Sequence, residues 1–201
     1  MNRSILVLSL LLMPVLALAQ TAEEYFLKGV AEAEKGDYKE ALQFYDKSIE
    51  LNPDVAETYY NRGNARDNLG DYSGAVRDFS KSIELVPGYA DAYNNRGMSK
   101  SNLGDYRGAV KDFDKAIELK PKDANQYINR GYSKARLGDY SGALEDFNKA
   151  IELKPNDAAA YYNRGLSEIA LQKKDSGCLD LSKALELGDP SAGEMIDRFC
   201  R

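Results

Sequence analysis

The chain contains no histidine, the side chain that enzymes use most often as a general base and that metal sites use most often as a ligand. It also lacks any cluster of glycines that resembles a phosphate-binding loop. Carboxylates are plentiful, but they recur at regular intervals, at expected helix caps and on solvated helix faces. We therefore predict no catalytic residue, no bound metal and no cofactor.

Positive charge is scarce as well. The 27 Lys and Arg residues are outnumbered by 32 Asp and Glu residues, which gives a formal net charge of −5. A nucleic-acid-binding protein usually presents a basic face, so no nucleic-acid partner is expected. Past residue 19 no apolar stretch is long enough to cross a membrane. We therefore do not expect stable membrane insertion of the chain that follows residue 19.

The first nineteen residues differ from the rest. Arg3 supplies a positive charge, residues 5–12 are apolar apart from one serine, and Ala17-Leu18-Ala19 has the small residues that signal peptidase accepts. Residues 5–19 are fewer than the roughly 20 that span a bilayer. We predict that residues 1–19 are a cleaved signal peptide and that the protein is periplasmic or secreted. An uncleaved anchor is the alternative.

Cysteine is rare, with only Cys178 and Cys200. Residue 189, midway between them, lies in the turn Gly188-Asp189-Pro190. In an antiparallel helix pair, residues equidistant from the turn face each other. We predict a disulfide that would stabilise the end of the chain by roughly 3 kcal/mol. Two buried free thiols are the alternative.

The remaining sequence is an array of units that repeat at a constant interval. Glycines recur at Gly29, Gly63, Gly97, Gly131 and Gly165, prolines at Pro53, Pro87, Pro121 and Pro155, and tyrosines at Tyr38, Tyr72, Tyr106 and Tyr140. Each unit of such an array buries its apolar face on its neighbour, so no separate globular core is needed.

Each unit is predicted to be two helices joined by a sharp turn. In the second unit the first helix spans residues 56–69, Gly70 can adopt the left-handed C-terminal cap, and Asp71 can cap a second helix that ends near residue 85. Capping boxes are predicted for the pairs Asp54–Glu57, Asp123–Gln126 and Ser191–Glu194.

The apolar spacing predicts which residues form the core. Tyr59, Gly63, Ala75, Phe79 and Ile83 recur one unit later and would lie between packed helices. The first-helix tyrosines, Tyr25, Tyr59, Tyr93, Tyr127 and Tyr161, are interpreted as residues that pack between helices. An aromatic binding platform is the alternative.

The motif YYNRG, followed by LGDY and KAIELKP, resembles the tetratricopeptide repeat over nearly all of the chain after the leader. The resemblance implies an all-α, right-handed solenoid of five helix–turn–helix units, residues 22–55, 56–89, 90–123, 124–157 and 158–191. The fifth unit is degenerate, because Gln172-Lys173-Lys174 replaces Gly-Asp-Tyr at its turn. Residues 191–201 are predicted to form a capping helix.

Arginine and aspartate appear together in four of the units. The arginines are Arg62, Arg96, Arg130 and Arg164, and the aspartates are Asp78, Asp112, Asp146 and Asp180. The first unit has Lys28 and Phe44 instead. We predict ion pairs within each unit, worth at most about 1 kcal/mol each if exposed. The alternatives are pairing of Asp78 with Arg96 of the next unit and an anion-binding strip of arginines.

The resemblance also implies a groove, lined by the first helices, that holds a peptide or a partner helix. By repeat position its residues would be Phe26, Val30, Tyr60, Asn61, Asn64, Asn94, Asn95, Met98, Ile128, Asn129, Tyr132, Tyr162, Asn163 and Leu166. In the family, asparagines at the places of Asn61, Asn95, Asn129 and Asn163 hold the backbone of a bound peptide.

The predicted groove changes in character along its length. Its entrance carries the acids Glu23, Glu57, Asp67 and Asp91, and its far end is apolar. This gradient suits an extended ligand with a basic part, although the acids can equally serve helix N-termini. We predict a non-catalytic adaptor that binds a protein or peptide in the cell envelope. A self-associating structural scaffold with no peptide ligand is the alternative.

Overall fold

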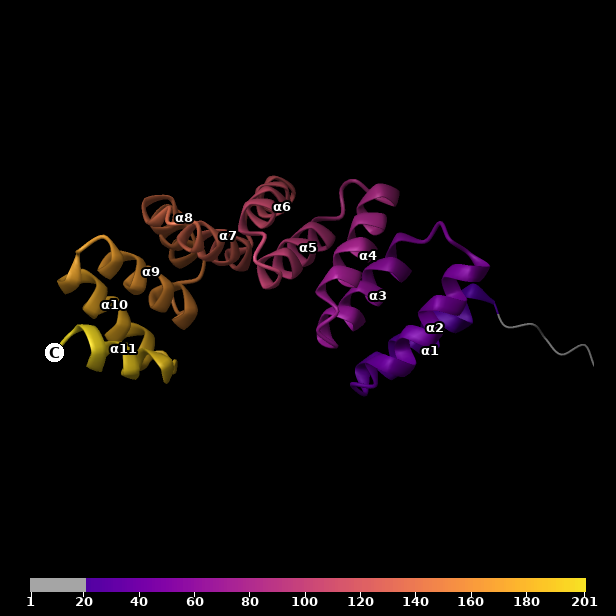
Figure 1. The fold of residues 1–201 in the computed structure, drawn as a ribbon, viewed down its shortest axis with the longest axis horizontal. Helices are drawn as coiled ribbons and strands as arrows, with labels where there is room; N and C mark the ends of the chain where they lie inside the picture. Colours follow the sequence, from indigo (N-terminus) through magenta and orange to yellow (C-terminus); the bar gives the residue numbers. More distant parts are fainter. Residues whose placement is uncertain (1–20) are drawn as a thin grey trace, which may run out of the picture.

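The computed structural model describes residues 21–201, which form eleven α-helices and no strand (Figure 1). The helices are α1 (Ala22–Glu34), α2 (Tyr38–Leu51), α3 (Ala56–Asn68), α4 (Tyr72–Leu85), α5 (Ala90–Asn102), α6 (Tyr106–Leu119), α7 (Ala124–Arg136), α8 (Tyr140–Leu153), α9 (Ala158–Ala170), α10 (Lys174–Glu186) and α11 (Ser191–Phe199). The predicted all-α solenoid is confirmed. The predicted signal peptide lies outside the described residues.

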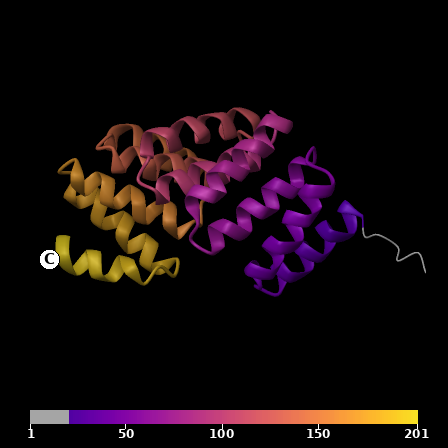
Figure 2. The ribbon, with the colours of Figure 1, turned by 45° about the vertical axis from the view of Figure 1, so that its right-hand side comes forward.

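The helices stack in sequence order into an elongated array. Each odd-numbered helix up to α9 packs against the even-numbered helix that follows it, and each pair packs against the next pair. Consecutive odd-numbered helices from α1 to α9 also contact one another. The described chain therefore begins and ends at opposite ends of the array (Figures 1 and 2).

The turn inside each unit follows the predicted chemistry. Gly36, Gly70, Gly104 and Gly138 have positive φ between 79° and 85°. The aspartate that follows caps the second helix, as where Asp71 Oδ1 accepts from the backbone N–H of Gly74 at 2.9 Å. In the fifth unit Gln172 adopts a φ of 64°, and Lys173 provides no side-chain cap. The packed helices thus hold Gln172 in the same left-handed conformation as the glycines, although this conformation costs a residue with a side chain roughly 1 kcal/mol.

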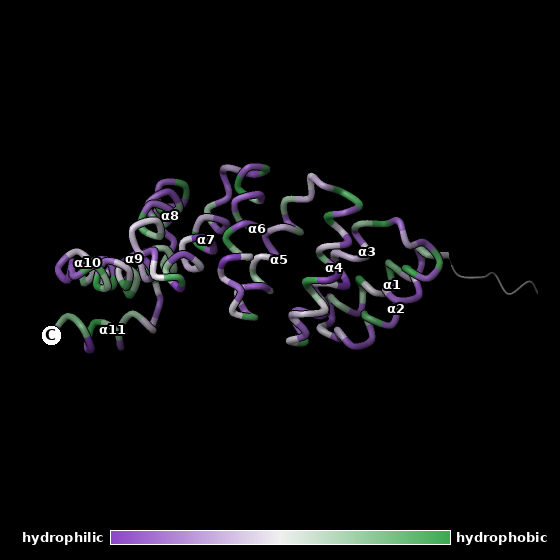
Figure 3. The backbone as a smooth tube through the Cα atoms, turned by 45° about the horizontal axis from the view of Figure 1, so that its top comes forward, coloured by the Kyte–Doolittle hydropathy of each residue, from purple (hydrophilic) through white to green (hydrophobic). Residues whose placement is uncertain are grey.

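Glycine in each first helix allows an aromatic ring from the second helix to approach closely. Phe79, Phe113 and Phe147 are fully buried. A Cβ atom added at Gly97 would lie 2.8 Å from Cε1 of Phe113, a distance at which something must move. The buried aromatic rings thus lie where the two backbones of a helix pair come close together. Along each helix, apolar and polar residues alternate, as the changing colours of the tube in Figure 3 show.

The predicted capping boxes Asp54–Glu57, Asp123–Gln126 and Ser191–Glu194 are wrong. Helix α3 begins after Val55, one residue beyond Asp54, and has no side-chain cap. Asp123 does cap α7, but the side chain of Gln126 is buried instead of reaching back. Helix α11 already includes Ser191, whose backbone N–H donates to Asp189 Oδ1 at 2.9 Å. In α3 and α11 the helix starts one residue away from the predicted position, which removes the geometry that a capping box needs.

Helix α11 continues the repeat register. Ala192 and Arg198 stand one full repeat after Ala158 and Arg164, and Ala192 is fully buried. Helix α11 therefore takes the place of the first helix of a sixth unit and packs against α10. No second helix follows it among the described residues. The disulfide between Cys178 in α10 and Cys200, just after α11, fastens α11 to α10 in place of the packing that a second helix would provide.

Candidate functional site

The odd-numbered helices α1 to α9 bring the predicted groove residues onto one continuous side of the array. Most of these side chains are half-buried, and only Met98 and Tyr132, in α5 and α7, are among the exposed large ones. In the first unit Leu27 occupies the position that asparagine holds in the other four, and it is 56% exposed. The predicted set of groove residues missed Leu27, although the repeat register identifies it.

Two small hollows lie along this side, one repeat apart. The first, of about 180 Å³, is lined by Asn64, Asp67, Asn68, Phe79, Asn95 and Met98. The second, of about 150 Å³, is lined by Met98, Ser101, Asn102, Phe113, Asn129 and Tyr132. Met98 separates them and contributes to both. Each hollow has room for one side chain of a partner, and we call them the Asp67 hollow and the Ser101 hollow.

The groove asparagines are hydrogen-bonded to one another. Asn95 Nδ2 donates to Asn64 Oδ1 at 2.8 Å and to the hydroxyl of Tyr60 at 3.1 Å. Asn94 Nδ2 donates to Asn95 Oδ1, and Asn129 Nδ2 donates to Asn94 Oδ1. The amides thus form a chain from α3 to α7. A bound peptide backbone would have to replace some of these bonds.

Asn61 and Asn163, the first and last asparagines of this set, donate to backbone carbonyls instead of to other asparagines. Asn61 Nδ2 donates to the carbonyl of Glu57 at 3.1 Å, and Asn163 Nδ2 donates to the carbonyl of Ala159 at 2.8 Å. Each of these amides therefore uses one of its two N–H donors on its own helix. The peptide-holding role that the resemblance assigns to these asparagines remains a prediction.

The arginines pair with the aspartates of their own units. Arg62 donates from Nε to Asp78 Oδ2 at 3.0 Å and from Nη2 to Oδ1 at 2.6 Å. The pairs Arg96–Asp112, Arg130–Asp146 and Arg164–Asp180 have the same bidentate geometry. The aspartate side chains are between 3% and 11% exposed. The figure of at most about 1 kcal/mol applies to an exposed pair. Because these aspartates are buried, loss of the partner costs more.

Each of these arginines also reaches the preceding unit. The third contact is made by Nη1 with a residue sixteen positions earlier, Asp46 for Arg62, Ser80 for Arg96, Asp114 for Arg130 and Asn148 for Arg164. The guanidinium lies over the tyrosine three residues before it, 5.4 Å from the ring centre in the case of Arg62 and Tyr59. We call this set of contacts the arginine ladder. It joins consecutive units, which the sequence pattern did not predict.

The first unit replaces the ladder with apolar packing. Tyr25 and Phe44 stack with ring centres 6.5 Å apart, and Lys28 lies 5.9 Å from the Tyr25 ring centre. No earlier unit within the described residues could accept a third contact there.

Two family models match the sequence. One, described as a TPR repeat, matches residues 29–70 and 133–167, and the other, the tetratricopeptide repeat, matches residues 56–89 and 90–123. Together they cover well over half of the chain. The chain belongs to the tetratricopeptide repeat family. No curated protein matches the chain by sequence.

Solved tetratricopeptide structures share the fold over most of their length. A crystal structure of MamA is 26% identical, with 83% of this chain and 91% of that chain covered and a TM-score of 0.77. YrrB, a tetratricopeptide protein with an unusual peptide-binding site, is 25% identical, with 88% and 92% covered and a TM-score of 0.77. MamA from Desulfovibrio magneticus RS-1 is 23% identical over 85% and 97%, with a TM-score of 0.80, and is similar in fold.

Membership of this family makes the chain a protein–protein interaction adaptor, and neither matching family model is catalytic. Within residues 21–201 no group of three or more Cys, Asp or Glu side chains is arranged to hold a metal ion. In the same range, no helix combines the length and the apolar character that crossing a bilayer requires.

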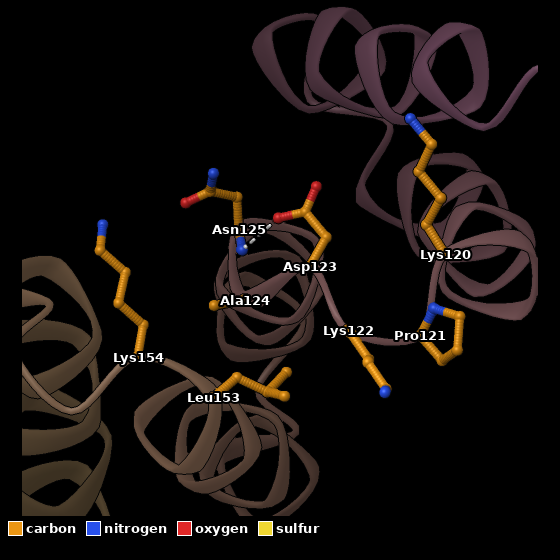
Figure 4. Close-up of a pocket in the computed structure, with 8 residues that line it drawn as sticks. All are labelled: Lys120, Pro121, Lys122, Asp123, Ala124, Asn125, Leu153 and Lys154. Atoms are coloured by element: carbon orange, nitrogen blue, oxygen red, sulfur yellow. Dashed lines mark hydrogen bonds between the residues drawn. The ribbon is translucent and has the colours of Figure 1, made fainter.

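A larger hollow lies away from the groove. It has a volume of about 770 Å³ and lies between the α6–α7 loop and the end of α8 (Figure 4). Lys122 points away from the direction shared by Lys120 and Lys154, and these two are already paired, Lys120 with Asp91 and Lys154 with Asp157. The hollow is wide and open, and we do not take it as the functional site.

The fifth tetratricopeptide unit departs from the ladder at one residue. In units two to four a second cation, Arg66, Lys100 or Lys134, contacts the ladder aspartate at 2.7 to 2.8 Å. In the fifth unit Glu168 occupies this position, and its Oε2 is buried without a hydrogen-bond partner. Burial, and then the charge of Asp180, raise the pKa of Glu168 above its ordinary value of 4.5.

Replacing Glu168 with lysine should therefore stabilise the protein. We expect Glu168→Lys to raise the free energy of unfolding at pH 7 by about 1 kcal/mol, because it supplies the missing cation.

The folded protein holds the Glu168 proton more tightly than the unfolded chain, so lowering the pH from neutral toward 4.5 favours folding of the parent. This gain should be absent from Glu168→Gln. Urea unfolding between pH 7 and pH 5 measures the difference, and parallel pH profiles for parent and Glu168→Gln would contradict it.

Proposed function

We propose that the chain binds an extended segment of a partner protein, without covalent chemistry, in the groove along α3, α5 and α7. The observation that carries this proposal is the pair of hollows on either side of Met98. Neighbouring packed helices are about 8–10 Å apart, which corresponds to roughly three residues of extended chain. Two side chains of one extended segment can therefore enter both hollows.

Several further features support this proposal. The hollows are lined mainly by apolar and amide groups from rigid helices, with the Asp67 carboxylate in one and the Ser101 hydroxyl in the other, so the surface is largely formed before binding. The similar protein YrrB has a peptide-binding site. A groove of this kind gives a partner side-chain pockets for specificity and hydrogen-bonding amides for its backbone.

A displayed library of random decapeptides, selected on residues 20–201, tests the proposal. We expect selected peptides to bind Tyr132→Ala at least tenfold more weakly than the parent, because Tyr132 lines the Ser101 hollow and is 39% exposed. Lys111→Ala, an exposed change on α6, is the control and should bind normally.

Unchanged binding by Tyr132→Ala would contradict the proposal, as would the failure of any peptide to bind the parent. In either case a self-associating scaffold becomes the better interpretation. Sedimentation equilibrium of the same sample would then give a molar mass well above that of one chain.

We further propose that the adaptor works in a bacterial envelope, in the periplasm or after secretion. The composition of residues 1–19 supports this location, and a disulfide suits an oxidising compartment. The mass of protein expressed from the full sequence in a bacterial host tests it. We expect a mature chain that begins at Gln20, and an intact leader on soluble protein would contradict export with cleavage.

A further inference from the structure

The Asp67 hollow contains a carboxylate with no cation beside it. Within residues 21–201 Asp67 forms no ion pair, and its Oδ1 accepts a hydrogen bond from Ser99 Oγ at 2.5 Å. The side chain is half-buried. The cations nearest along the two helices, Arg66 and Lys100, are held by Asp78 and Asp112.

Another acid on the same side of the array is already neutralised. Asp91, at the start of α5, accepts from Lys120 Nζ with both oxygens, at 2.7 and 2.8 Å. The ladder aspartates are each held by the bidentate contact of an arginine. Asp67 is thus a groove carboxylate whose counter-ion is left for a partner to supply.

We infer that the Asp67 hollow receives a lysine or arginine side chain of the bound segment. The inference rests on the groove function proposed above and names the specificity of that site. Met98, which is 41% exposed, provides apolar contact for the methylene stem, while the charged head reaches Asp67 at the polar side of the hollow. A hydrogen bond between two charged groups is roughly twice as strong as one between neutral groups. An acidic side chain would be repelled.

The neighbouring hollow supplies an internal comparison. Ser101 stands where Asp67 stands one repeat earlier, and Phe113 and Asn129 correspond to Phe79 and Asn95. No Asp, Glu, Lys or Arg of the described chain lines this hollow, and the Oγ atom of Ser101 is hydrogen-bonded to Ser133 Oγ at 2.8 Å. The Ser101 hollow should therefore take an uncharged side chain. The bound segment then has a basic residue and an uncharged residue about three positions apart.

The same decapeptide library tests this specificity. Selection on the parent should enrich lysine or arginine at one position. In a selected peptide, replacing that residue with norleucine should weaken binding to the parent by about tenfold and to Asp67→Asn by less than twofold. Asp67→Asn preserves the size of the side chain and an oxygen that can accept from Ser99, so the fold should be retained; circular dichroism checks this. Ser101→Ala is the matched control and should keep the full preference for the basic residue.

The outcomes separate the two proposals. Peptides that bind the groove without a basic residue, or a basic preference that survives in Asp67→Asn, would overturn the inference while leaving the groove function intact. If no peptide binds the parent, both fall together. The assignment is supported if Asp67→Asn loses the preference for a basic residue and Ser101→Ala keeps it.

Discussion

Replacing Asp146 with alanine should lower the free energy of unfolding by about 3 kcal/mol. Breaking a buried ion pair by removing one partner costs about 3–5 kcal/mol, since the other charge is left uncompensated. Asp146 is 4% exposed and binds both Arg130 and Lys134. Lys134 is 20% exposed and can turn toward water, which places the expected loss at the lower end of the range.

Arg130 cannot relieve the change by losing its proton. Burial acts to lower the pKa of Arg130, but hydrogen bonds to Asp146 and Asp114 outweigh it, and the pKa lies above its ordinary value. In Asp146→Ala the bond to Asp146 is gone, but the guanidinium still stays charged within the packed interface of two units, because arginine is not deprotonated in proteins. In this variant it keeps the contact with Asp114 of the preceding unit and its position over the Tyr127 ring, but loses its buried carboxylate partner.

Asp114 provides a control on the same arginine. Its Oδ1 lies 2.7 Å from Arg130 Nη1, but its side chain is 55% exposed. Water replaces an exposed partner easily, so Asp114→Ala should cost no more than about 1 kcal/mol. Urea unfolding followed by circular dichroism gives both values. Equal losses for Asp146→Ala and Asp114→Ala would show that burial does not decide the strength of the ladder.

Removing the disulfide should loosen α11 and leave the rest of the array folded. The bond joins Cys178 and Cys200, whose Cα atoms are 5.7 Å apart and which are separated by 22 residues. Closing a loop of this length is worth about 3 kcal/mol. In Cys178→Ser with Cys200→Ser, hydrogen exchange of α11 amides should therefore become faster by about two powers of ten. Helix α11 depends on this bond because it has no following helix to pack against among the described residues.

Two controls test whether the effect is confined to α11 and is caused by the disulfide. Amides of α5 and α6, far from the bond along the array, should exchange at the same rate in parent and variant, because each unit contacts only its neighbours. A reductant should reproduce the effect in the parent and change nothing in the variant. Unchanged protection of α11 in the variant would mean that packing on α10 alone holds the helix.

The sequence predicted the pairs of the arginine ladder but not its strength. Arginine and aspartate appear together in four units, and this pattern indicated their contact. Burial of Asp78 and its equivalents, and the third contact of each arginine with the unit before it, depend on how consecutive units stack. The stacking angle is a property of whole helix pairs, and the residues of one unit do not encode it separately.

The positions of the groove asparagines along the array follow from the repeat, but their hydrogen-bond partners do not. Repeat position placed Asn94, Asn95 and Asn129 along one side of the array, as the structure does. Their donors are turned to one another, which no property of a single asparagine predicts. The isolation of Asp67 from every cation of the described chain also emerges only when the partners of Arg66 and Lys100 are known.

The sequence by itself determined the number of units, the helix pairs and the turn at each glycine, because these depend on interactions within a single unit that repeats. Tertiary structure alone decided which charges are buried, which amides are occupied and where side-chain-sized hollows remain. Those features depend on the distance between residues of neighbouring units. Small changes in helix packing alter such distances without any change in the repeat pattern. This explains why Gln172 adopts a turn that its own residue type disfavours, and why Asp67 is left without a counter-ion.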